Sequence, residues 1–460
     1  MRTGSLSSRI YLTVSVNNVA YTVNAFRPSR RNPLLFGWSF FASWMTIELA
    51  WAHLIWQVLA TLLFGRMGAL KRAPGKAALG LSVASWLGLG VLVKQSFEAR
   101  REIRAALGEV LDQPVPRKRL PIKVTRDVQY HMVTTERRRV FGRRRQTVER
   151  VKQLELDVYQ PVDLPEPGTL RPVVMQIHGG GWMIGDKREQ GLPLLKLLAS
   201  QGWVGFNVNY QLSPAVAFPE MLIDLKRAVV WIREHADEYH LDPTFIAVTG
   251  GSAGGHLAAM MALTADDPEY QPGFEGADTS VQAAAPFYGV YDFTNRNGVW
   301  FPEAIDHFIG RFVIQQRFSE NPEAFVKASP LDRVHAAVPP MLVIHGDKDT
   351  LAPVEDARDF ARRLQVTSTQ PSHYLELHGA QHAFDLFPSI RCNAVISAVD
   401  QFFTRTYEAH VTAGAEPDAL GLDRGGPFIP DPVAGSVPPG QRRADAASVS
   451  ISTASSGLEV

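Results

Sequence analysis

Between residues 173 and 377 the chain repeats one pattern, in which a short continuous run of apolar residues is followed by a segment long enough for a helix. The runs are VVMQI (173–177), VGFNVN (204–209), FIAVT (245–249), AAAPFYG (283–289), MLVIH (341–345) and YLEL (374–377). Strands without polar alternation are typical of a sheet that is covered on both faces. Their spacing of roughly 30 to 50 residues leaves room for crossover helices. The pattern predicts an α/β fold with a mostly parallel sheet and helices on both faces.

The sequence GGSAGG, residues 250–255, lies between the run FIAVT and a helix-like run, HLAAMMAL. A strand that turns directly into a helix with a serine at its apex forces strained backbone angles and close packing, which small residues permit. The serine hydroxyl is then exposed at the edge of the sheet. G-x-S-x-G alone is weak evidence, but in this strand–turn–helix context it predicts that Ser252 is a nucleophile.

A nucleophilic serine needs a base within hydrogen-bond distance and a carboxylate that orients the base. The run MLVIH is followed by GDKDTLAP, and YLEL by HGAQHAFD. Both turns fall at the carboxyl ends of strands, the edge of an open α/β sheet that holds ligands. We predict Asp349 as the acid and His382 as the base, in the chain order that this architecture has. Asp347 could replace Asp349, although a turn aspartate more often caps its own loop.

The base has several rivals in the sequence. His345 and His373 fall at strand edges, where we expect them to be packed. His256 begins the helix after the serine, where an imidazole is expected on the helix surface. His378 precedes His382 in the same loop and is its strongest rival. We favour His382 because it lies in a small-residue loop well past the strand.

The motif HGGGW, residues 178–182, follows the apolar run VVMQI. Acyl transfer requires hydrogen-bond donors for the developing oxyanion. Three consecutive glycines let backbone N–H groups face a ligand closely, and an ordinary turn needs only one glycine. We predict Gly180, Gly181 and Ala253 as the donors, and we expect His178 to brace this loop rather than take part in the chemistry.

Taken together, these motifs resemble the hormone-sensitive-lipase-like branch of α/β-hydrolase carboxylesterases, and within it actinobacterial membrane-linked esterases. The resemblance rests on HGGGW, NYQLSP (209–214) with FP (218–219) and Asp224, GGSAGG, HGDKDTLAP and GAQHAF, and it covers about residues 150–408. Gly251 stands where much of the branch has an acidic residue, and Gln211 where it has arginine. The D-x-x-A/V-P form of the acid turn is shared with peptidase and feruloyl-esterase relatives, which leaves the substrate open.

The expected function is that of a serine carboxylic-ester hydrolase, which works through an acyl-enzyme and requires no metal or organic cofactor. We expect five aromatic residues to line a pocket for short- to medium-chain apolar esters: Trp182, Phe287, Tyr288, Trp300 and Phe301. An amidase or formamidase, or an acyltransferase, would use the same residues. A non-catalytic membrane binding protein on a hydrolase scaffold is a further alternative, but such a protein would usually lose a triad member.

The first hundred residues are the most uneven part of the chain. Residues 33–64 and 77–93 are almost free of charge, and at about 1.5 Å per residue the first is long enough to cross a hydrocarbon core of about 30 Å. We predict a membrane-associated helical hairpin over residues 33–95, after an N-terminal segment, 1–32. Glu48 weakens this prediction, since an unpaired carboxylate in a membrane is costly. The alternative is a soluble lid of apolar helices packed over an active site.

No cleavable signal peptide is evident, because the apolar stretch starts late and runs long. Nine basic residues flank the outer ends of the predicted hairpin and four lie in its loop, which favours both chain ends, and the catalytic domain, on the cytoplasmic side. The nine are Arg2, Arg9, Arg27, Arg30, Arg31, Lys94, Arg100, Arg101 and Arg104, and the four are Arg66, Lys71, Arg72 and Lys76.

The rest of the chain divides by composition. We predict a linker over residues 96–121, beginning with a charged helix, then a catalytic domain over 122–410 with a lid-like insertion at 292–329. Residues 411–460 are rich in Ala, Gly, Pro, Ser and Asp, and we predict a disordered tail. Two strand-like runs flank RRRVFGRRR (137–145), a solvated hairpin tip or a contact for anionic lipid.

Charge and cysteine content exclude some functions. The chain of 460 residues carries 47 basic and 46 acidic residues, which gives no overall electrostatic footprint for nucleic acid. A single cysteine, Cys392, excludes an internal disulfide and a thiolate metal cluster. The resemblance implies a small-molecule or lipid ester as substrate, and the apolar N-terminal segments predict a membrane as partner; the sequence does not predict the oligomeric state.

Overall fold

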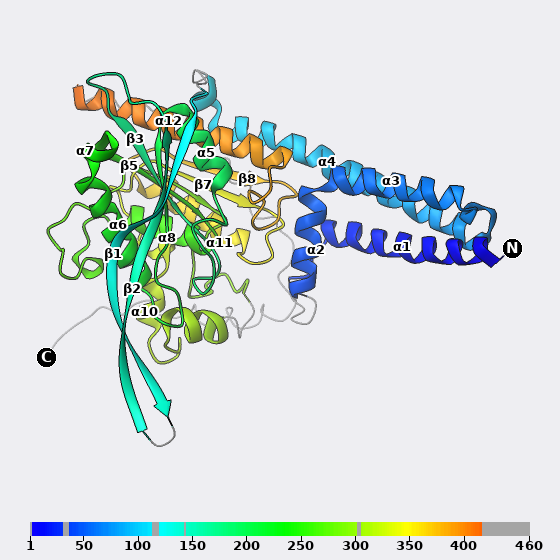
Figure 1. The fold of residues 1–460 in the computed structure, drawn as a ribbon, viewed down its shortest axis with the longest axis horizontal. Coiled ribbons are helices and arrows are strands. Elements are labelled where there is room, and N and C mark those ends of the chain that lie inside the picture. The colour runs from blue at the N-terminus through cyan, green and yellow to red at the C-terminus, as the bar shows by residue number, and fades with distance from the viewer. Residues whose placement is uncertain (1, 31–35, 113–118, 142–143, 301–304, 416–460) are drawn as a thin grey trace, which may run out of the picture.

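The computed structural model describes residues 2–30, 36–112, 119–141, 144–300 and 305–415. Figure 1 shows a twisted sheet with helices on both sides, which we call the sheet domain, and an elongated group of helices that projects from it. The strands are β1 (Ile122–Phe141), β2 (Arg144–Pro161), β3 (Arg171–Ile177), β4 (Val204–Val208), β5 (Leu241–Gly251), β6 (Ala283–Phe287), β7 (Met341–Gly346) and β8 (Ser372–Leu377). The α-helices are α1 (Arg2–Phe26), α2 (Phe36–Glu48), α3 (Ala50–Arg66), α4 (Ala73–Asp112), α5 (Leu192–Gln201), α6 (Glu220–Glu234), α7 (Ala236–Tyr239), α8 (Ala253–Leu263), α10 (Pro322–Lys327), α11 (Val354–Thr367) and α12 (Ile390–Ala415). A π-helix, η3 (Ile305–Ile314), and the 3-10 turns η1 (Ala69–Lys71), η2 (Pro268–Tyr270) and η4 (Pro330–Asp332) complete the described elements.

The strands form one eight-stranded sheet in the order β1-β2-β4-β3-β5-β6-β7-β8. β1 pairs antiparallel with β2, and β2 with β4, whereas every pair from β4 to β8 is parallel. The six strands predicted from apolar runs are all present and make up this parallel part. The α/β fold predicted from the sequence is confirmed.

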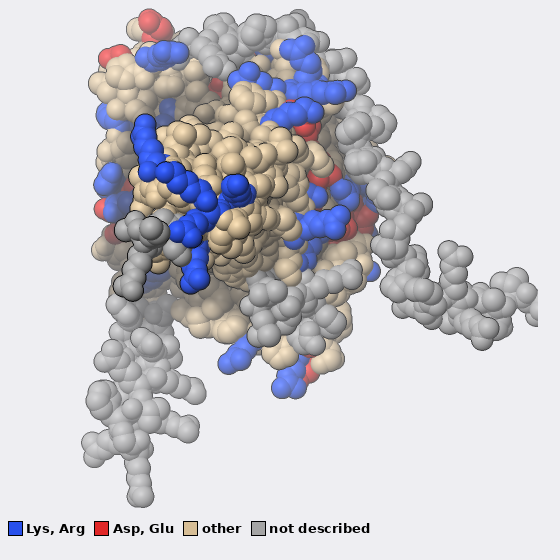
Figure 2. Space-filling view, turned by 90° about the vertical axis from the view of Figure 1, so that its right-hand side faces the viewer, with Lys and Arg blue, Asp and Glu red and all other residues tan. Residues whose placement is uncertain are grey.

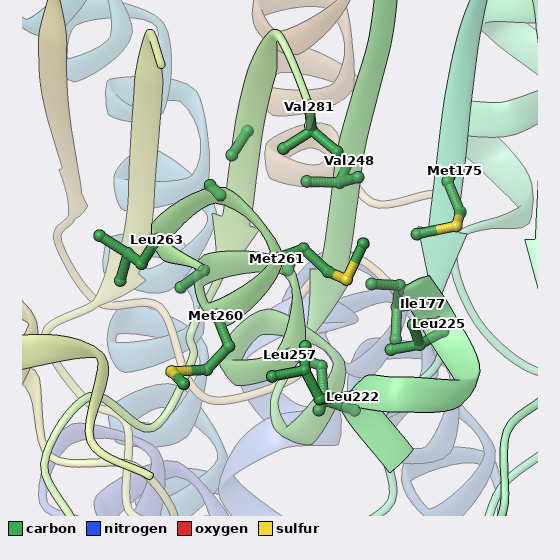
Figure 3. Close-up of a cluster of buried hydrophobic side chains, with 14 of the residues drawn as sticks. Met175, Ile177, Leu222, Leu225, Val248, Leu257, Met260, Met261, Leu263 and Val281 are labelled. Carbon is green, nitrogen blue, oxygen red and sulfur yellow. The ribbon is translucent and has the colours of Figure 1, made fainter. Parts of the chain in front are cut away.

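Each face of the sheet carries its own core. Along β3, Val173 and Met175 point into a core with α6, α8 and α11, while Val174 points into a second core with α5 and α12. Side chains alternate between faces along a strand, so a strand that is apolar throughout needs a cover on both sides. Figure 3 shows part of the first core, where Met260 and Met261 of α8 lie among residues of β3, β5 and α6.

α1, α3 and residues 73–94 of α4 form an arm that projects from the sheet domain (Figure 1). The Tyr11 hydroxyl lies 3.0 Å from the Ser82 hydroxyl, and Thr22 lies 2.8 Å from Ser85, so α1 and α4 run side by side in the same direction. The chain therefore starts at the far end of the arm, beside the turn between α3 and α4. Helix α1 was not part of the predicted hairpin, because its many hydroxyl and amide side chains hide its length in a hydropathy profile.

The predicted first membrane segment, residues 33–64, is not one straight helix. α2 and α3 meet at Leu49 with a bend of 87°. Glu48 at this bend is fully buried, pairs with Arg391, and accepts a hydrogen bond of 2.7 Å from Ser389 of the sheet domain. The carboxylate thus has protein partners, and α2 lies against the sheet domain. By length and composition α4 could cross a membrane, and the bent α2–α3 pair could do so only if it counts as one span.

The predicted linker begins with a helix, as expected, but this helix is the packed end of α4. Residues 96–112 continue α4, and Ala99, Ile103 and Leu107 pack into the second core of the sheet domain. Their apolar spacing of three and four residues is that of a packed helix face. β1 and β2 extend through most of the arginine-rich segment, so the two long strands project well beyond the sheet (Figure 1). Of the predicted tail, residues 411–415 belong to α12, and the rest lies outside the described residues.

Candidate active site

Ser252 lies at the turn between β5 and α8, in a backbone conformation that side chains rarely adopt. Its φ is 60° and its ψ is −122°. The turn is held on both sides, because the Ser252 N–H donates to the Phe287 carbonyl at 3.0 Å and the Ser252 carbonyl accepts from the His256 N–H at 2.9 Å. The strained turn lifts the hydroxyl to the carboxyl edge of the sheet, as the motif predicts.

The glycines around Ser252 are explained by close backbone contacts. A Cβ on Gly254 would lie 2.2 Å from the Ile177 carbonyl oxygen, and one on Gly250 2.5 Å from the same oxygen. A Cβ on Gly251 would lie 2.5 Å from the Tyr288 hydroxyl. The acidic residue that much of the family has at this position would therefore collide with Tyr288.

Asp349 and His382 are brought together by the turns after β7 and β8. His382 Nδ1 lies 2.7 Å from Asp349 Oδ2, and both side chains are buried. The other carboxylate oxygen of Asp349 accepts the N–H groups of Leu351 and Ala352, each at 2.8 Å. Burial alone would raise the pKa of Asp349, but His382, with His345 next to it, holds the pKa well below its usual range. Asp349 is thus a fixed carboxylate hydrogen bonded to the His382 imidazole, the arrangement that a carboxylate has when it orients a catalytic base.

The two strongest rivals, Asp347 and His378, pair with each other instead. His378 Nδ1 lies 2.8 Å from Asp347 Oδ2, and more than half of the His378 side chain is exposed. The sequence order D-x-D and H-x-x-x-H therefore gives two carboxylate–imidazole pairs, of which only the Asp349–His382 pair is buried at the cavity described below.

The three remaining candidates for the base are all buried. His345 lies 3.4 Å from Asp349 and binds the Ala352 carbonyl, and His373 is buried at its strand edge, as predicted. The prediction that His256 lies on a helix surface is wrong. α8 is buried on all sides, and burial lowers the pKa of His256 to about 4, although its hydrogen bond to the Ala328 carbonyl opposes the shift.

The HGGGW loop runs beside Ser252. A Cβ on Gly179 would lie 3.1 Å from the Ser252 Cβ, and Gly180 and Gly181 have φ values of 115° and 59°. In the described part of the chain, the backbone N–H groups of Gly180, Gly181 and Ala253 have no protein acceptor. His178 stacks on Tyr210 with its Nδ1 2.8 Å from the Gly179 carbonyl, an arrangement that suits the predicted bracing of this loop.

A cavity of about 510 Å³ opens at this edge of the sheet. Its lining includes Ser252, Asp349, His382, Gly181 and Trp182. Most of the remaining wall is apolar and comes from Val290, Val299, Trp300, Phe308, Ile309, Leu351, Ala352 and Pro353. The space suits an apolar group next to the serine.

Two predicted pocket residues, Phe287 and Tyr288, do not line this cavity. The Phe287 side chain is buried against Phe384, and Tyr288 donates a hydrogen bond to Asp385 with its ring 4.5 Å from that of His382. Phe287 is the last residue of β6 and Tyr288 follows it, so both pack behind the site and support it. Trp182 and Trp300 do line the cavity, and Phe301 lies outside the described residues.

Arg30 is a cavity residue that sequence reasoning missed. Its guanidinium donates to the Asp347 carbonyl at 2.8 Å and lies 3.4 Å from Glu355. The sequence shows only one arginine of a basic cluster before the apolar segment. No local pattern places it next to a turn more than 300 residues away.

Gln211, the second departure from the family pattern, contacts Asp224. Its backbone N–H donates to Asp224 at 2.9 Å and its side-chain amide at 3.3 Å. Burial raises the pKa of Asp224 to about 6, and the two hydrogen bonds from Gln211 counter this only in part. A neutral amide therefore holds a buried carboxyl group where an arginine would supply a charge.

Comparison with known proteins identifies the family. The BD-FAE family model matches residues 156–364. LipM of Mycobacterium tuberculosis, named as a carboxylic ester hydrolase, is 38% identical over 426 residues, which cover 88% of this chain and 95% of LipM. The chain belongs to the hormone-sensitive-lipase-like carboxylesterases. This esterase is also 43% identical to esterase LipQ of the same organism, over 58% of its own length and 62% of LipQ.

The match with LipM extends beyond the sheet domain into the N-terminal helices, because 88% of the chain is more than the sheet domain contains. Among solved structures, esterase Est2 of Thermogutta terrifontis with bound butyrate is 25% identical, with a TM-score of 0.44 over 59% of this esterase and 92% of that chain.

Proposed function

We propose that this esterase cleaves carboxylic esters with a triad of Ser252, Asp349 and His382. The observation that carries the proposal is the buried Asp349–His382 pair, 2.7 Å apart, at a cavity that Ser252 also lines. Nδ1 of His382 carries a proton when it donates to the carboxylate, which leaves Nε2 free to accept the serine proton. This is the tautomer that general-base catalysis needs.

The proposed reaction has two halves. Ser252 Oγ attacks the ester carbonyl while His382 takes the hydroxyl proton, and the tetrahedral intermediate collapses when His382 protonates the leaving alcohol. Water, deprotonated by His382, then attacks the acyl-enzyme, the bond to Ser252 Oγ breaks, and His382 returns the proton to this oxygen as the acid is released. The backbone N–H groups of Gly180, Gly181 and Ala253 bind the oxyanion in both halves, and their lack of protein acceptors within the described residues supports this role.

We propose an apolar ester of short to medium chain length as the substrate. The cavity wall is mostly aliphatic and aromatic, and about 510 Å³ is enough for a small acyl or alcohol group. Trp182 and Trp300 contact the apolar part of the substrate. The Trp300 ring is itself held by a 2.9 Å hydrogen bond from its indole N–H to Asp356.

We further propose that the arm lies in a membrane. Its side chains are sorted as in a membrane protein, with hydroxyl groups inside and large apolar groups outside. Tyr11, Ser15, Thr61 and Ser82 form a buried chain of hydrogen bonds between the helices. Exposed residues on the three helices include Leu6, Ile10, Val16, Trp51, Ile55, Trp56, Leu59, Leu62, Leu63, Val83, Leu87 and Val91. Hydrogen bonds and close packing hold helices together in lipid, where no hydrophobic force acts between them.

The side of the membrane is less constrained than the sequence indicated. Arg2 and Arg9 lie on α1 toward its start, at the end of the arm that carries the basic α3–α4 loop. Moving them to that end changes the sequence-based count of flanking basic residues from nine against four to seven against six. Figure 2, which looks at the molecule from the arm side, shows Lys and Arg side chains across an otherwise mostly uncharged surface. A cytoplasmic sheet domain remains our proposal.

Labelling with a fluorophosphonate probe tests the triad. Wild-type protein in detergent should be labelled at Ser252, and Ser252→Ala should abolish labelling and ester hydrolysis. Undiminished labelling of Ser252→Ala would overturn the proposal. A series of p-nitrophenyl esters from acetate to palmitate tests the substrate class, where a steady rise in kcat/KM up to palmitate would contradict it.

A further inference from the structure

Helix α2 lies at the base of the arm, against the loop that carries His382. In Figure 1 it stands across the end of the arm next to the sheet domain. Its two ends have different partners, since Ser39 near the start is hydrogen bonded to Asn24 of α1, and Glu48 at the end is paired with Arg391 of α12. Between them, Ser43 and Trp44 contact the His382 loop directly.

Gln381 connects this helix to both triad loops. Its side-chain oxygen accepts the N–H of His382 at 2.9 Å and the N–H of Thr350, which follows Asp349, at 2.8 Å. Its side-chain N–H₂ group donates to the Ser43 hydroxyl of α2 at 2.9 Å. Gln381 and Ser43 are both fully buried. One amide thus holds the base loop and the acid loop together and is itself oriented from α2.

Trp44 holds the other side of the same loop. Its indole N–H donates to the Ala383 carbonyl at 2.9 Å, and its ring stacks on Phe387 at 4.8 Å between centroids. Ala383 has a φ of 60°, a conformation that a residue with a Cβ keeps only when its surroundings hold it. The residues before and after His382 are therefore both tied to α2.

Glu48 fixes the end of α2 to the sheet domain. The carboxylate is fully buried with Arg391 and Ser389, and Ser389 also accepts the N–H of Cys392 at 3.0 Å. A buried ion pair of this kind is costly to break, because a lone charge would be left without water. The pair therefore holds the end of α2 against the sheet domain.

We propose that α2 is part of the catalytic scaffold, with Ser43, Trp44 and Gln381 as positioning residues for His382. This inference rests on the proposed triad. The arm then has a second task besides attachment, because the helix that joins it to the sheet domain also sets the position of the catalytic base. Displacement of about 1 Å at a catalytic group can reduce the rate by about a hundredfold, so loss of these contacts should lower kcat more than it changes KM.

The test uses full-length protein in detergent and three variants, Ser43→Ala, Trp44→Phe and Gln381→Met. Trp44→Phe keeps a ring for stacking and loses the hydrogen bond to Ala383. Ser39→Ala and Trp38→Phe are matched controls on the same helix, since Ser39 bonds to α1 and Trp38 packs against Tyr21 of α1. kcat and KM for p-nitrophenyl butyrate, Tm, and the fluorophosphonate labelling rate are measured for each protein.

We expect kcat to fall about tenfold in Ser43→Ala and Trp44→Phe and about ten- to a hundredfold in Gln381→Met, with KM within about twofold. Ser43→Thr, which keeps the hydroxyl, should retain most of the wild-type kcat. The two control variants should keep kcat within about twofold even where their Tm falls.

Two results would overturn the inference. One is an unchanged kcat in all three variants, and the other is a loss of kcat that follows Tm equally in the variants and the controls. Both leave the triad intact if Ser252→Ala still abolishes labelling. Failure of the triad itself appears differently, as labelling that survives Ser252→Ala in otherwise wild-type protein.

Discussion

Helices α8 and α3 are both strongly apolar, but they differ in which side chains are buried. All eleven residues of α8 are buried, including Met260, Met261 and Leu263. On α3 the buried residues are Ala50, Gln57, Ala60 and Thr61, while Leu59, Leu62 and Leu63 are each more than half exposed. The protein itself covers α8, whereas the large apolar side chains of α3 lie on the surface of the arm, which suits the membrane location that we propose. The apolar composition of a helix therefore does not distinguish a helix in a protein core from a helix with apolar side chains on the surface.

The boundary between these two regions passes through α2. Its buried face carries Ser43 and Glu48 toward the sheet domain, and its other face leaves Trp38 and Phe41 exposed. Such a helix belongs to both regions. The predictions below test the two regions separately, beginning with the sheet domain.

The largest effect is expected where two similar aspartates face different surroundings. Asp349→Asn should lower kcat by about 10⁴-fold, because an amide would favour the wrong tautomer of His382. Asp347→Asn should stay within about threefold, since its partner His378 is largely exposed. Steady-state kinetics with p-nitrophenyl butyrate measures both. Equal losses would show that the two pairs share the work.

Leucine-to-alanine substitutions in the two regions should differ in their effect on the free energy of unfolding, measured in detergent. Leu257→Ala in the fully buried core of the sheet domain should lower the free energy of unfolding by about 2–5 kcal/mol. Leu87→Ala on the arm, where the side chain is 70% exposed, should change it by less than about 0.5 kcal/mol.

Chemical unfolding curves compare these two variants with the wild type. A large loss in Leu87→Ala would mean that the arm packs against protein on that face. A companion variant, Leu59→Asp with Leu87→Asp, should move protein out of the membrane fraction of cells, because charged side chains are costly in lipid.

The sheet was predictable because its signal is local. Each buried strand is a continuous apolar run, and the small residues around Ser252 report contacts that no larger side chain could make. The rule that parallel strands end at one edge brought the two turns together, and chain order and loop position favoured Asp349 and His382 within them.

The arm and the pocket were less predictable because they depend on contacts between distant parts of the chain, or on a surface where apolar side chains are exposed and hydroxyl groups are buried. α1 has apolar residues on its exposed face and hydroxyl residues on its buried face. The hydroxyl residues lower its mean hydropathy, so the hydropathy pattern did not indicate this helix. Glu48 weakened the membrane prediction, because the sequence does not show its partner. The fold places Arg391, more than 300 residues away in the chain, next to it. Phe287 and Tyr288 were assigned to the pocket because they are aromatic. At the end of β6, however, their side chains pack behind the site and do not line the cavity.

Asp224 should contribute less to the stability of the sheet domain as pH rises from 4 to 7. The pKa of Asp224 is raised to about 6 from 3.8, so the folded state binds its proton more tightly than the unfolded state. Stability from this group is full below pH 4 and is lost as pH rises through 6, by an amount on the order of 2–3 kcal/mol. Asp356, with a pKa also raised to about 6, acts in the same direction.

Asp224→Asn isolates the contribution of the one buried carboxyl group. The stability of the variant relative to the wild type should increase between pH 4.5 and 7.5, and Gln211→Arg should do the same by supplying a charge. Thermal unfolding across this pH range gives both comparisons. Identical slopes in the wild type and Asp224→Asn would rule out this group as the cause.

The smallest expected effect tests the buried hydroxyl chain of the arm. The Tyr11 hydroxyl lies 2.9 Å from Thr61 and 3.0 Å from Ser82, and the side chain is 1% exposed. Tyr11→Phe keeps the ring that stacks on Phe64 and removes only the hydroxyl, which should cost about 1 kcal/mol.

Tyr21→Phe on the same helix is the matched control, because its side chain is 39% exposed. Thermal unfolding of the two variants in detergent should separate them by a few degrees. Equal Tm values would mean that the hydroxyl chain does not hold α1 to the arm, and the arm would then depend on packing of its small residues. That result would also weaken the inverted sorting of side chains as support for a membrane-embedded arm, since polar contacts inside would no longer be what joins its helices.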